Sequence, residues 1–359
     1  MMFKVLYLPS TPFNVLVSAA MANARRENDC SHLWLIDQSQ TTNNPYYQAL
    51  MKWPNSPFEK IMVFSGEAKG WAKFIERQDN FKEIEQGLNQ FKPDVIAVGS
   101  DRRIEFQYAM HWLKKQSFLV EGWYLDDGLY SYVGRPSNLL KDGVNSWLKK
   151  IVYGLWWKEP KTVGASGWID KTWLFRPKQA VVELLHKNNQ RVEPEWFTNS
   201  NMQQLSQLVF EEVGFSYEFL SKVDYVVIVP HPNNQLKIQC YENRIKSLVS
   251  KLSAQGQKIA VKYHPRQIGE DDLDFLQDSN VSLISATLAF EFILPLLSPG
   301  ATVIGDVCTA LLTTKWLRED LCSIAVLNAD DPFQKRFIPM FSSAGVTLLN
   351  DFKELNKIL

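Results

Sequence analysis

Two short polar motifs in this chain each follow an apolar run. Residues 124–128 read Tyr-Leu-Asp-Asp-Gly, and residues 262–266 read Lys-Tyr-His-Pro-Arg. Ligands of open α/β sheets bind just outside the carboxyl ends of the strands. We therefore expect one cleft with a carboxylate on one wall and a histidine on the other. A carboxylate can remove a proton from a hydroxyl, and a histidine can steady a phosphate leaving group.

The first motif offers two carboxylates, Asp126 and Asp127, followed by Gly128, which we assign to donor binding. Adjacent side chains at a strand end point in opposite directions. One carboxylate should therefore face the cleft, and the other should cap the following turn, since Asp-Gly favours turns. Which of the two is the base stays open. The alternative is that the motif is only a strand-ending turn.

The second motif places His264 at a strand end, where Pro265 stiffens the loop. The flanking Lys262 and Arg266 favour an anion nearby. The alternative is a histidine whose bonds are purely structural. A second His-Pro pair begins at His231, so the working histidine is open between the two. We prefer His264 because basic residues flank it and two candidate phosphate turns follow it.

The candidate nucleotide site lies at two strand-to-helix turns, residues 285–288 and 305–312. Free amides at a helix N-terminus bind phosphate, and a hydroxyl can add a donor. One such turn is ordinary helix capping, whereas two beside a His-Pro loop favour a nucleotide. The side chains that these turns contribute are Ser285, Thr287, Glu291, Cys308 and Thr309.

Two loops of the first half, residues 9–14 and 99–103, should lie on the same sheet edge as the Asp-Asp-Gly motif. Arg102 and Arg103 would bind an acidic sugar or form a salt bridge with Glu105, and both interpretations stay open. The candidate acceptor-binding residues in these loops are Ser10, Thr11, Asn14, Ser100, Asp101 and Arg102.

Alternating strand and helix patterns must position these motifs. The expected strands are residues 4–8, 33–36, 60–64, 95–98, 118–125, 225–229, 258–262, 282–284, 302–304, 323–327 and 347–349. Helical patterns include residues 13–25, 71–90 and 236–252. The alternation predicts an α/β protein with two doubly wound parallel sheets.

The length of 359 residues favours two domains. We place them at residues 1–185, which carry the acceptor side and the general base, and 186–359, which bind the donor. The boundary follows from the polar, basic run 187–191 that precedes Pro194. The last helix, residues 351–359, could cross back onto the first domain.

Composition also narrows the functional classes to which the protein can belong. Lys+Arg and Asp+Glu both total 39, which disfavours a nucleic-acid binder. The four cysteines lack CxxC spacing and the five histidines are scattered, so no metal is expected. The N-terminus resembles a first strand rather than a signal peptide, and no window of about 18 apolar residues exists. We expect a cytoplasmic protein.

Residues 141–178 depart from the strand-helix pattern because they combine tryptophans with an excess of lysine and arginine. Aromatic rings and lysines suit an anionic membrane surface, so peripheral contact with the cytoplasmic face of the inner membrane is one interpretation. The other is an irregular connector whose tryptophans pack on the core. The aromatic residues are Trp147, Trp156, Trp157, Trp168, Trp173 and Phe175.

Together the motifs resemble those of bacterial sialyltransferases. Asp126-Asp127-Gly128 looks like the family's Asp-(Asp/Glu)-Gly motif, and His264-Pro265 looks like its His-Pro motif. The turn at Cys308-Thr309 is similar to its phosphate turn, although Cys308 stands where a serine is usual. The lipooligosaccharide sialyltransferases of glycosyltransferase family 52 and the bacterial polysialyltransferases resemble the chain most.

The resemblance implies a GT-B fold, with two Rossmann-like domains facing a central cleft. It implies CMP-sialic acid as the donor and metal-independent inversion at the anomeric carbon. The acceptor would be a cell-surface glycan, either lipooligosaccharide or capsule. Asp126 would be the base, and His264 would assist phosphate departure. Some family 52 members place the base outside this motif. The alternatives are a Kdo transferase using CMP-Kdo and a non-catalytic nucleotide-sugar-binding protein of glycan assembly.

Overall fold

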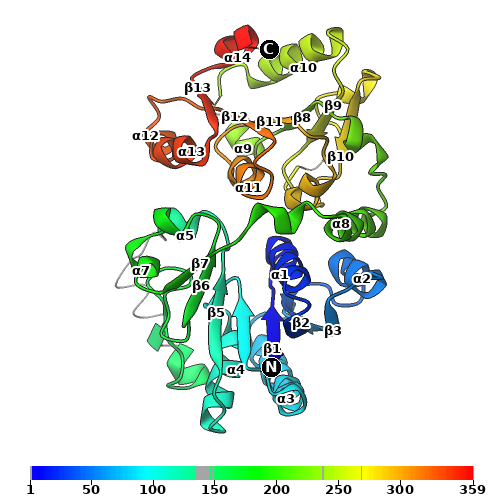
Figure 1. The fold of residues 1–359 in the computed structure, drawn as a ribbon. Helices are drawn as coiled ribbons and strands as arrows, with labels where there is room; N and C mark the ends of the chain where they lie inside the picture. Colours follow the sequence, from blue (N-terminus) through cyan, green and yellow to red (C-terminus); the bar gives the residue numbers. More distant parts are fainter. Residues whose placement is uncertain (1, 135–145, 148, 237, 268, 359) are drawn as a thin grey trace. The chain divides into compact units, whose positions relative to one another are not determined.

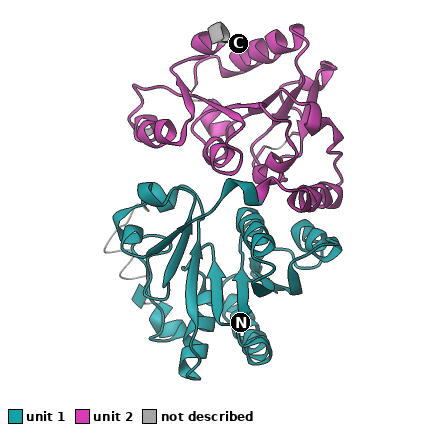
Figure 2. Ribbon diagram, viewed as in Figure 1, with its two compact units in different colours: residues 1–196 teal, residues 197–359 magenta. Residues whose placement is uncertain are grey.

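The computed structural model describes residues 2–134, 146–147, 149–236, 238–267 and 269–358. The chain divides into two compact units, Met1–Trp196 and Phe197–Leu359 (Figure 2). Each unit is an α/β domain with a sheet of its own, as the sequence predicts.

The sheet of the first unit has seven strands in the order β3-β2-β1-β4-β5-β6-β7 (Figure 1). Its strands are β1 (Phe3–Leu8), β2 (Asp29–Gln38), β3 (Phe58–Ser65), β4 (Val95–Val98), β5 (Glu121–Leu125), β6 (Lys171–Leu174) and β7 (Asn188–Arg191). Its helices are α1 (Pro12–Ala24), α2 (Pro45–Lys52), α3 (Trp71–Phe91), α4 (Ile104–Lys115), α5 (Tyr130–Val133) and α7 (Val182–Leu185), with the 3₁₀ helices η1 (Pro177–Gln179) and η2 (Pro194–Phe197).

The sheet of the second unit has six strands in the order β10-β9-β8-β11-β12-β13. Its strands are β8 (Tyr225–Ile228), β9 (Ile259–Lys262), β10 (Val281–Ile284), β11 (Thr302–Gly305), β12 (Cys322–Val326) and β13 (Thr347–Leu349). Its helices are α8 (Ser200–Val213), α9 (Pro232–Gln235), α10 (Tyr241–Ala254), α11 (Thr309–Leu317), α12 (Pro332–Lys335), α13 (Ile338–Ala344) and α14 (Phe352–Ile358), with η3 (Glu218–Lys222), η4 (Phe275–Gln277), η5 (Phe290–Phe292) and η6 (Leu294–Leu296).

The strand pairings described in both sheets are parallel. Parallel sheets are covered on both faces, so their strands are continuous apolar runs. The four residues of β4 are accordingly all buried, as are the four of β9. In each sheet the strand order reverses beside the first strand, between β1 and β4 and between β8 and β11. Ligands of such sheets bind at this switch point.

The local sequence explains where the site-bearing helices begin. Thr11 caps α1 by accepting a hydrogen bond from the Asn14 amide at 3.2 Å, and Pro12 occupies the first turn. Cys308 precedes α11 in an extended conformation, but its side chain makes no capping hydrogen bond.

The boundary between the units falls after Trp196, eleven residues beyond residue 185, where the sequence placed it. The intervening run contains β7, which pairs with β6 at the edge of the first sheet. Only the middle of β7 is partly buried. An edge strand of Asn, Gln and Arg looks like a polar linker in the sequence because it contributes little to the core.

One helix prediction in the second unit is wrong at its start. The predicted helix 236–252 begins only at Tyr241, because Cys240 has a positive φ of 53° that ends any helix continuing from α9. The last helix belongs to the second unit, and its crossing back onto the first unit stays a prediction. α14 packs on α10 and β13, with Leu355 fully buried and Phe352 against Tyr241.

No helix among the described residues is long and apolar enough to cross a membrane.

Candidate functional site

The candidate site of the first unit lies at the switch point between β1 and β4. Asn14, in the first turn of α1 after β1, is almost fully buried. A Cβ added to Gly99, which follows β4, would come within 2.2 Å of the Asn14 amide nitrogen. Only glycine therefore lets the β4 loop approach this side chain. The Asn14 Nδ2 donates a hydrogen bond of 2.7 Å to Asp127 Oδ1.

Asp126 is fully buried and accepts four hydrogen bonds. The amide of Gly128 donates at 3.0 Å, the Ser131 hydroxyl at 2.7 Å and the amide of Phe175 at 3.1 Å. The hydroxyl of Tyr132 also donates to it. Burial raises the pKa of Asp126, while these donors oppose the shift. The carboxylate thus fastens the turn after β5 to the chain that follows β6.

Asp127 has a different environment, although it is the next residue. Its side chain is partly exposed at the end of β5. The pKa of Asp127 is raised to about 7, mainly by desolvation and also by the charge of Asp126, while the Asn14 hydrogen bond and Arg103 oppose the rise. A carboxylate that titrates near neutral pH and is held by one side-chain donor is suited to accept a proton.

The prediction that one carboxylate faces outward and the other caps the turn agrees with this geometry. The resemblance assigned the base to Asp126, and the structure instead buries that residue. Asp127 is the residue of the pair that is open to a substrate. Gly128 has a φ of 100°, which fits glycine at this turn. Its amide belongs to the Asp126 turn, so its assignment to the donor stays a prediction.

The candidate acceptor residues separate into two groups. Thr11 and Asn14 lie at the start of α1, and the Ser10 hydroxyl bonds Asn14 Oδ1 at 3.3 Å, so these three lie around Asp127. Asp101 is fully buried and accepts the amides of Gly164 and Ser166 at 2.9 and 2.7 Å.

The assignment of Asp101 to the acceptor is therefore a correction: it orders the loop before β6. Ser100 is partly exposed in the turn after β4.

The arginines of this loop form salt bridges, as one of the two interpretations predicted, but with other partners than Glu105. Arg102 pairs with Glu159 at 2.6 Å, and Arg103 pairs with Asp37. Glu105 pairs with the buried Arg77 instead. Arg102 is thus committed to a carboxylate of its own chain, which removes the reason to assign it to an acidic acceptor.

The second unit contains a pocket of about 450 Å³ at its switch point between β8 and β11. Such a volume lies within the range of small-ligand sites. Its walls come from the loops after β8, β9 and β11 and from the chain entering η5. The polar side chains among its lining are His231, Asn234, Lys262, Tyr263, His264, Glu291, Asp306, Cys308 and Thr309, and Pro265 also lines it.

The two His-Pro pairs meet in this pocket. The ring centroids of His231 and His264 lie 4.8 Å apart with planes at 68°. Desolvation lowers the pKa of His264, with further lowering from His231, Arg266 and Lys262. The sequence left the choice between the two histidines open, and the structure places both rings at the same ligand-sized space.

Lys262 and two carboxyl groups complete the charged lining. Lys262 is buried, and its Nζ donates to the carbonyls of Ser285 and Ala286, both at 3.2 Å. Desolvation lowers the pKa of Lys262 to about 8. Burial raises the pKa of Glu291 and raises that of Asp306 to about 6. Lys262 therefore anchors the loop after β10 besides lining the pocket.

Of the two predicted strand-to-helix turns, one leads to an α-helix and the other to a 3₁₀ helix. α11 begins at Thr309, so Thr309 and Ala310, which line the pocket, lie in its first turn. Burial raises the pKa of the Cys308 thiol, which therefore stays protonated. The turn at 285–288 leads only to the short 3₁₀ helix η5, which begins at Phe290.

Three predicted donor residues lie outside this pocket lining. The Ser285 and Thr287 hydroxyls bond each other at 2.8 Å, and Thr287 is exposed. Arg266 is also exposed and donates its backbone amide to His264. The structure therefore brings together Lys262, His264, Pro265, Glu291, Cys308 and Thr309 and leaves Arg266, Ser285 and Thr287 at its margin.

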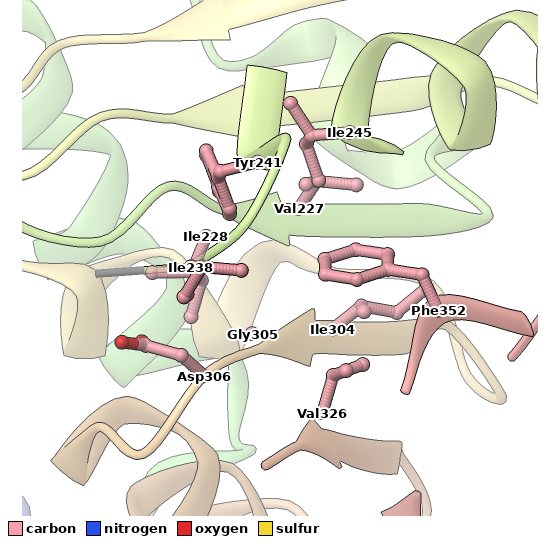
Figure 3. A pocket seen from close by; sticks show the side chains of 10 residues that line it. All are labelled: Val227, Ile228, Ile238, Tyr241, Ile245, Ile304, Gly305, Asp306, Val326 and Phe352. Atoms are coloured by element: carbon pink, nitrogen blue, oxygen red, sulfur yellow. The ribbon is translucent and has the colours of Figure 1, made fainter. Parts of the chain in front are cut away.

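Asp306 is the functional candidate that sequence reasoning did not single out. It lies between β11 and α11, where a carboxylate could have been suspected from its place in the run 305–312. A second space of only about 20 Å³ lies beside it and holds no more than a water molecule. Figure 3 shows that apolar side chains, including Tyr241 and Phe352, surround this space, with Asp306 at one edge.

The aromatic segment 141–178 is described only in part, because residues 141–145 and 148 lie outside the described residues. Trp157, Trp168 and Phe175 are buried, as the packing interpretation predicts. Trp156 is partly buried against Tyr108, with centroids 5.6 Å apart. Trp147 is 64% exposed. The segment is thus mainly a packed connector with one exposed tryptophan.

Among the described residues, no group of three or more His, Cys, Asp or Glu side chains could hold a metal ion. The metal independence of any reaction stays a prediction.

The fold is shared with solved structures of two kinds of enzyme. An alpha/beta-galactoside alpha-2,3-sialyltransferase from Photobacterium phosphoreum matches with a TM-score of 0.59 and 12% identity, covering 99% of this chain and 100% of that chain. The GT-B domain of a sialyltransferase from Photobacterium damselae matches with a TM-score of 0.55 and 12% identity, covering 97% and 100%. UDP-GlcNAc 2-epimerase from Methanocaldococcus jannaschii matches with a TM-score of 0.56 and 14% identity, covering 99% and 91%.

No family model matches the chain, and no curated protein matches it. At these identities the likeness concerns the fold, which is that of GT-B glycosyltransferases and of the epimerases that share it.

Proposed function

We propose that the protein is an inverting glycosyltransferase that moves sialic acid from CMP-sialic acid to a hydroxyl of a cell-surface glycan. The observation that carries the proposal is the environment of Asp127. A partly exposed carboxylate at a strand end, with a pKa raised to about 7 and one side-chain hydrogen bond, is suited to deprotonate a hydroxyl near neutral pH.

In the proposed reaction, the ionised Asp127 removes the proton of the acceptor hydroxyl as that oxygen attacks the anomeric carbon. The bond between the anomeric carbon and the phosphate oxygen breaks on the opposite face, and CMP leaves. The pocket of the second unit would bind the nucleotide, with its phosphate near His264 and the first turn of α11. That both substrates meet in one cleft is part of this proposal.

The sugar nucleotide is the least constrained element. The resemblance of the motifs supports CMP-sialic acid, and CMP-Kdo carries the same cytidine phosphate and an acidic sugar. The shared fold of the epimerases makes UDP-GlcNAc a necessary comparison. A non-catalytic protein of glycan assembly would bind a nucleotide sugar without turning it over.

The direct test is to incubate the protein with each of these three nucleotide sugars and a glycan acceptor, with and without EDTA. We expect CMP release from CMP-sialic acid that depends on the acceptor and survives EDTA. Turnover of CMP-Kdo alone would show that the transferred sugar is Kdo rather than sialic acid. Conversion of UDP-GlcNAc without CMP release, or tight binding without turnover, would refute the glycosyltransferase proposal. Asp127→Asn is the matched inactive control.

We also propose that the protein works at the cytoplasmic face of the membrane, and the exposed Trp147 supports this. Trp147→Ser should reduce binding to anionic vesicles while leaving the melting temperature unchanged, because this ring is mostly in solvent. Trp157→Ser, the buried control, should lower the melting temperature instead. Absence of vesicle binding by the parent protein would end the membrane proposal and leave the proposed reaction intact.

A further inference from the structure

His231 and His264 have the same local bonding although they follow different strands. The Nδ1 of His231 accepts a hydrogen bond of 3.0 Å from the Asn233 amide. The Nδ1 of His264 accepts one of 3.1 Å from the Arg266 amide. In both cases the donor lies two residues further on, across a proline. The two His-Pro turns therefore orient their rings by the same device.

This bonding determines where the ring protons are. A nitrogen that accepts a hydrogen bond from a backbone amide carries no proton, so each neutral ring has its proton on Nε2. Neither Nε2 has a hydrogen-bond partner among the described residues, and both rings line the 450 Å³ pocket. Each ring thus presents an N–H donor that is free for a ligand.

The same bonding opposes the charged form of the rings. Protonation would place a hydrogen on Nδ1, against the amide hydrogen that this nitrogen now accepts. Desolvation lowers the pKa of His264, and the positive charge of His231, Arg266 and Lys262 lowers it further. The groups of opposite sign that face the pocket are Glu291 and Asp306, whose pKa values burial raises. His264 is therefore suited to donate a hydrogen bond while remaining neutral, and the matching Nδ1 bond of His231 leaves its Nε2–H available in the same way.

We propose that His231 and His264 form a twin donor site for the phosphate of the nucleotide, and that neither ring gives up a proton during the reaction. This rests on the proposed function. When the anomeric carbon–oxygen bond breaks, its electron pair stays on the phosphate oxygen, and both Nε2–H groups stabilise that charge. A phosphate monoester has a second pKa of about 6. CMP can therefore leave as the dianion at neutral pH, and the only proton that moves in this step goes from the acceptor hydroxyl to Asp127.

Substituting each histidine by glutamine or asparagine tests whether the ring acts as a hydrogen-bond donor or as a proton-donating acid. The amide of glutamine can place an N–H near the position of Nε2, whereas the shorter asparagine places it near Nδ1, and neither titrates. His231→Gln and His264→Gln should retain turnover within about tenfold of the parent. The Asn and Ala variants should lose about 100-fold each, the usual effect of removing one preorganised donor. His186→Ala, at an exposed histidine of the other unit, is the matched control.

Turnover of the Gln variants as low as that of the Ala variants, with melting temperature and CMP binding retained, would overturn the proposal, because a donor alone would then be insufficient. If only one of His231→Ala and His264→Ala reduced turnover, the proposal that both rings bind the phosphate would be overturned.

A second measurement does not depend on turnover. Nitrogen-15 NMR of the histidine rings should show both as the Nε2–H tautomer at pH 7.5, and titration with inorganic phosphate should perturb both Nε2 signals but not those of His186. Rings that are charged or protonated on Nδ1, or a phosphate effect on one ring or neither, would contradict the proposal. If the parent turns over no nucleotide sugar but passes this NMR test, the proposed function fails and the phosphate site stands.

Discussion

The two candidate sites use their paired residues in opposite ways. In the first unit, the adjacent Asp126 and Asp127 have contrasting environments, one buried under four donors and the other partly open. In the second unit, His231 and His264 are distant in the sequence and have matching environments. Neighbours on a strand end point to opposite sides, whereas equivalent turns after adjacent parallel strands point to the same edge. The position on the sheet thus decides the role, rather than proximity in sequence.

The largest expected effect is that of Asp127→Asn, which should reduce turnover by about 1,000-fold because it removes the proton acceptor. The folded protein should not lose stability. The pKa of Asp127 is raised from 3.8 to about 7 in the folded state, so the fold favours the protonated form. Ionisation of Asp127 therefore destabilises the parent progressively as pH rises from 3.8 to about 7, and this penalty is fully present at pH 8.

Turnover assays with thermal melts at pH 8 check both expectations. Full activity of Asp127→Asn would show that the base lies elsewhere.

Asp126→Asn should act mainly on stability. Its amide NH₂ would face at least one of the donors that now bond the carboxylate, and an unsatisfied buried polar group costs about 1–3 kcal/mol. We expect a melting temperature lower by roughly 5 °C in a unit of this size. Turnover at a temperature where the variant is folded should fall less than in Asp127→Asn. A larger loss of turnover in Asp126→Asn than in Asp127→Asn would show that Asp126, and not Asp127, is the base.

The pH dependence of turnover tests the link between Asn14 and Asp127. Because the base must be ionised, kcat/KM should rise with pH through about 7 in the parent protein. Asn14→Ala removes the hydrogen bond that opposes the raised pKa, so the rise should move to higher pH. Turnover below pH 7 should then fall, while turnover well above it should change little. If Asn14→Ala does not shift the pH profile of kcat/KM, the hydrogen bond from Asn14 does not set the pKa of the base.

The smallest effect is expected for Thr309→Val in the second unit. This variant keeps the shape of the side chain and removes one hydroxyl from the first turn of α11. A single neutral hydrogen bond contributes about 1 kcal/mol, so CMP binding measured by calorimetry should weaken about fivefold. The pH profile should stay as in the parent, because the Thr309 hydroxyl does not titrate near neutral pH. A loss as large as that of the histidine Ala variants would make α11 the main phosphate site.

The sequence by itself determined the fold class and most of the strands, because parallel strands are continuous apolar runs bounded by polar turns. It also located both motifs at strand ends, which follows from the same runs. It could not reveal β7, whose polar residues at a sheet edge look like a linker. Nor could it end the helix before Tyr241, because the positive φ of Cys240 has no residue signature.

Only the tertiary structure decided that one residue of the aspartate pair, but both residues of the histidine pair, are open to a ligand. Asp126 is committed to the turn because Ser131, Tyr132 and the Phe175 amide converge on it from later parts of the chain. Asp127 became the open carboxylate because Asn14, from the first helix, approaches across the glycine at residue 99. The two histidines became partners because β8 and β9 are adjacent in the sheet. Hydrogen bonds between segments far apart in sequence depend on strand order, which local residue patterns do not encode.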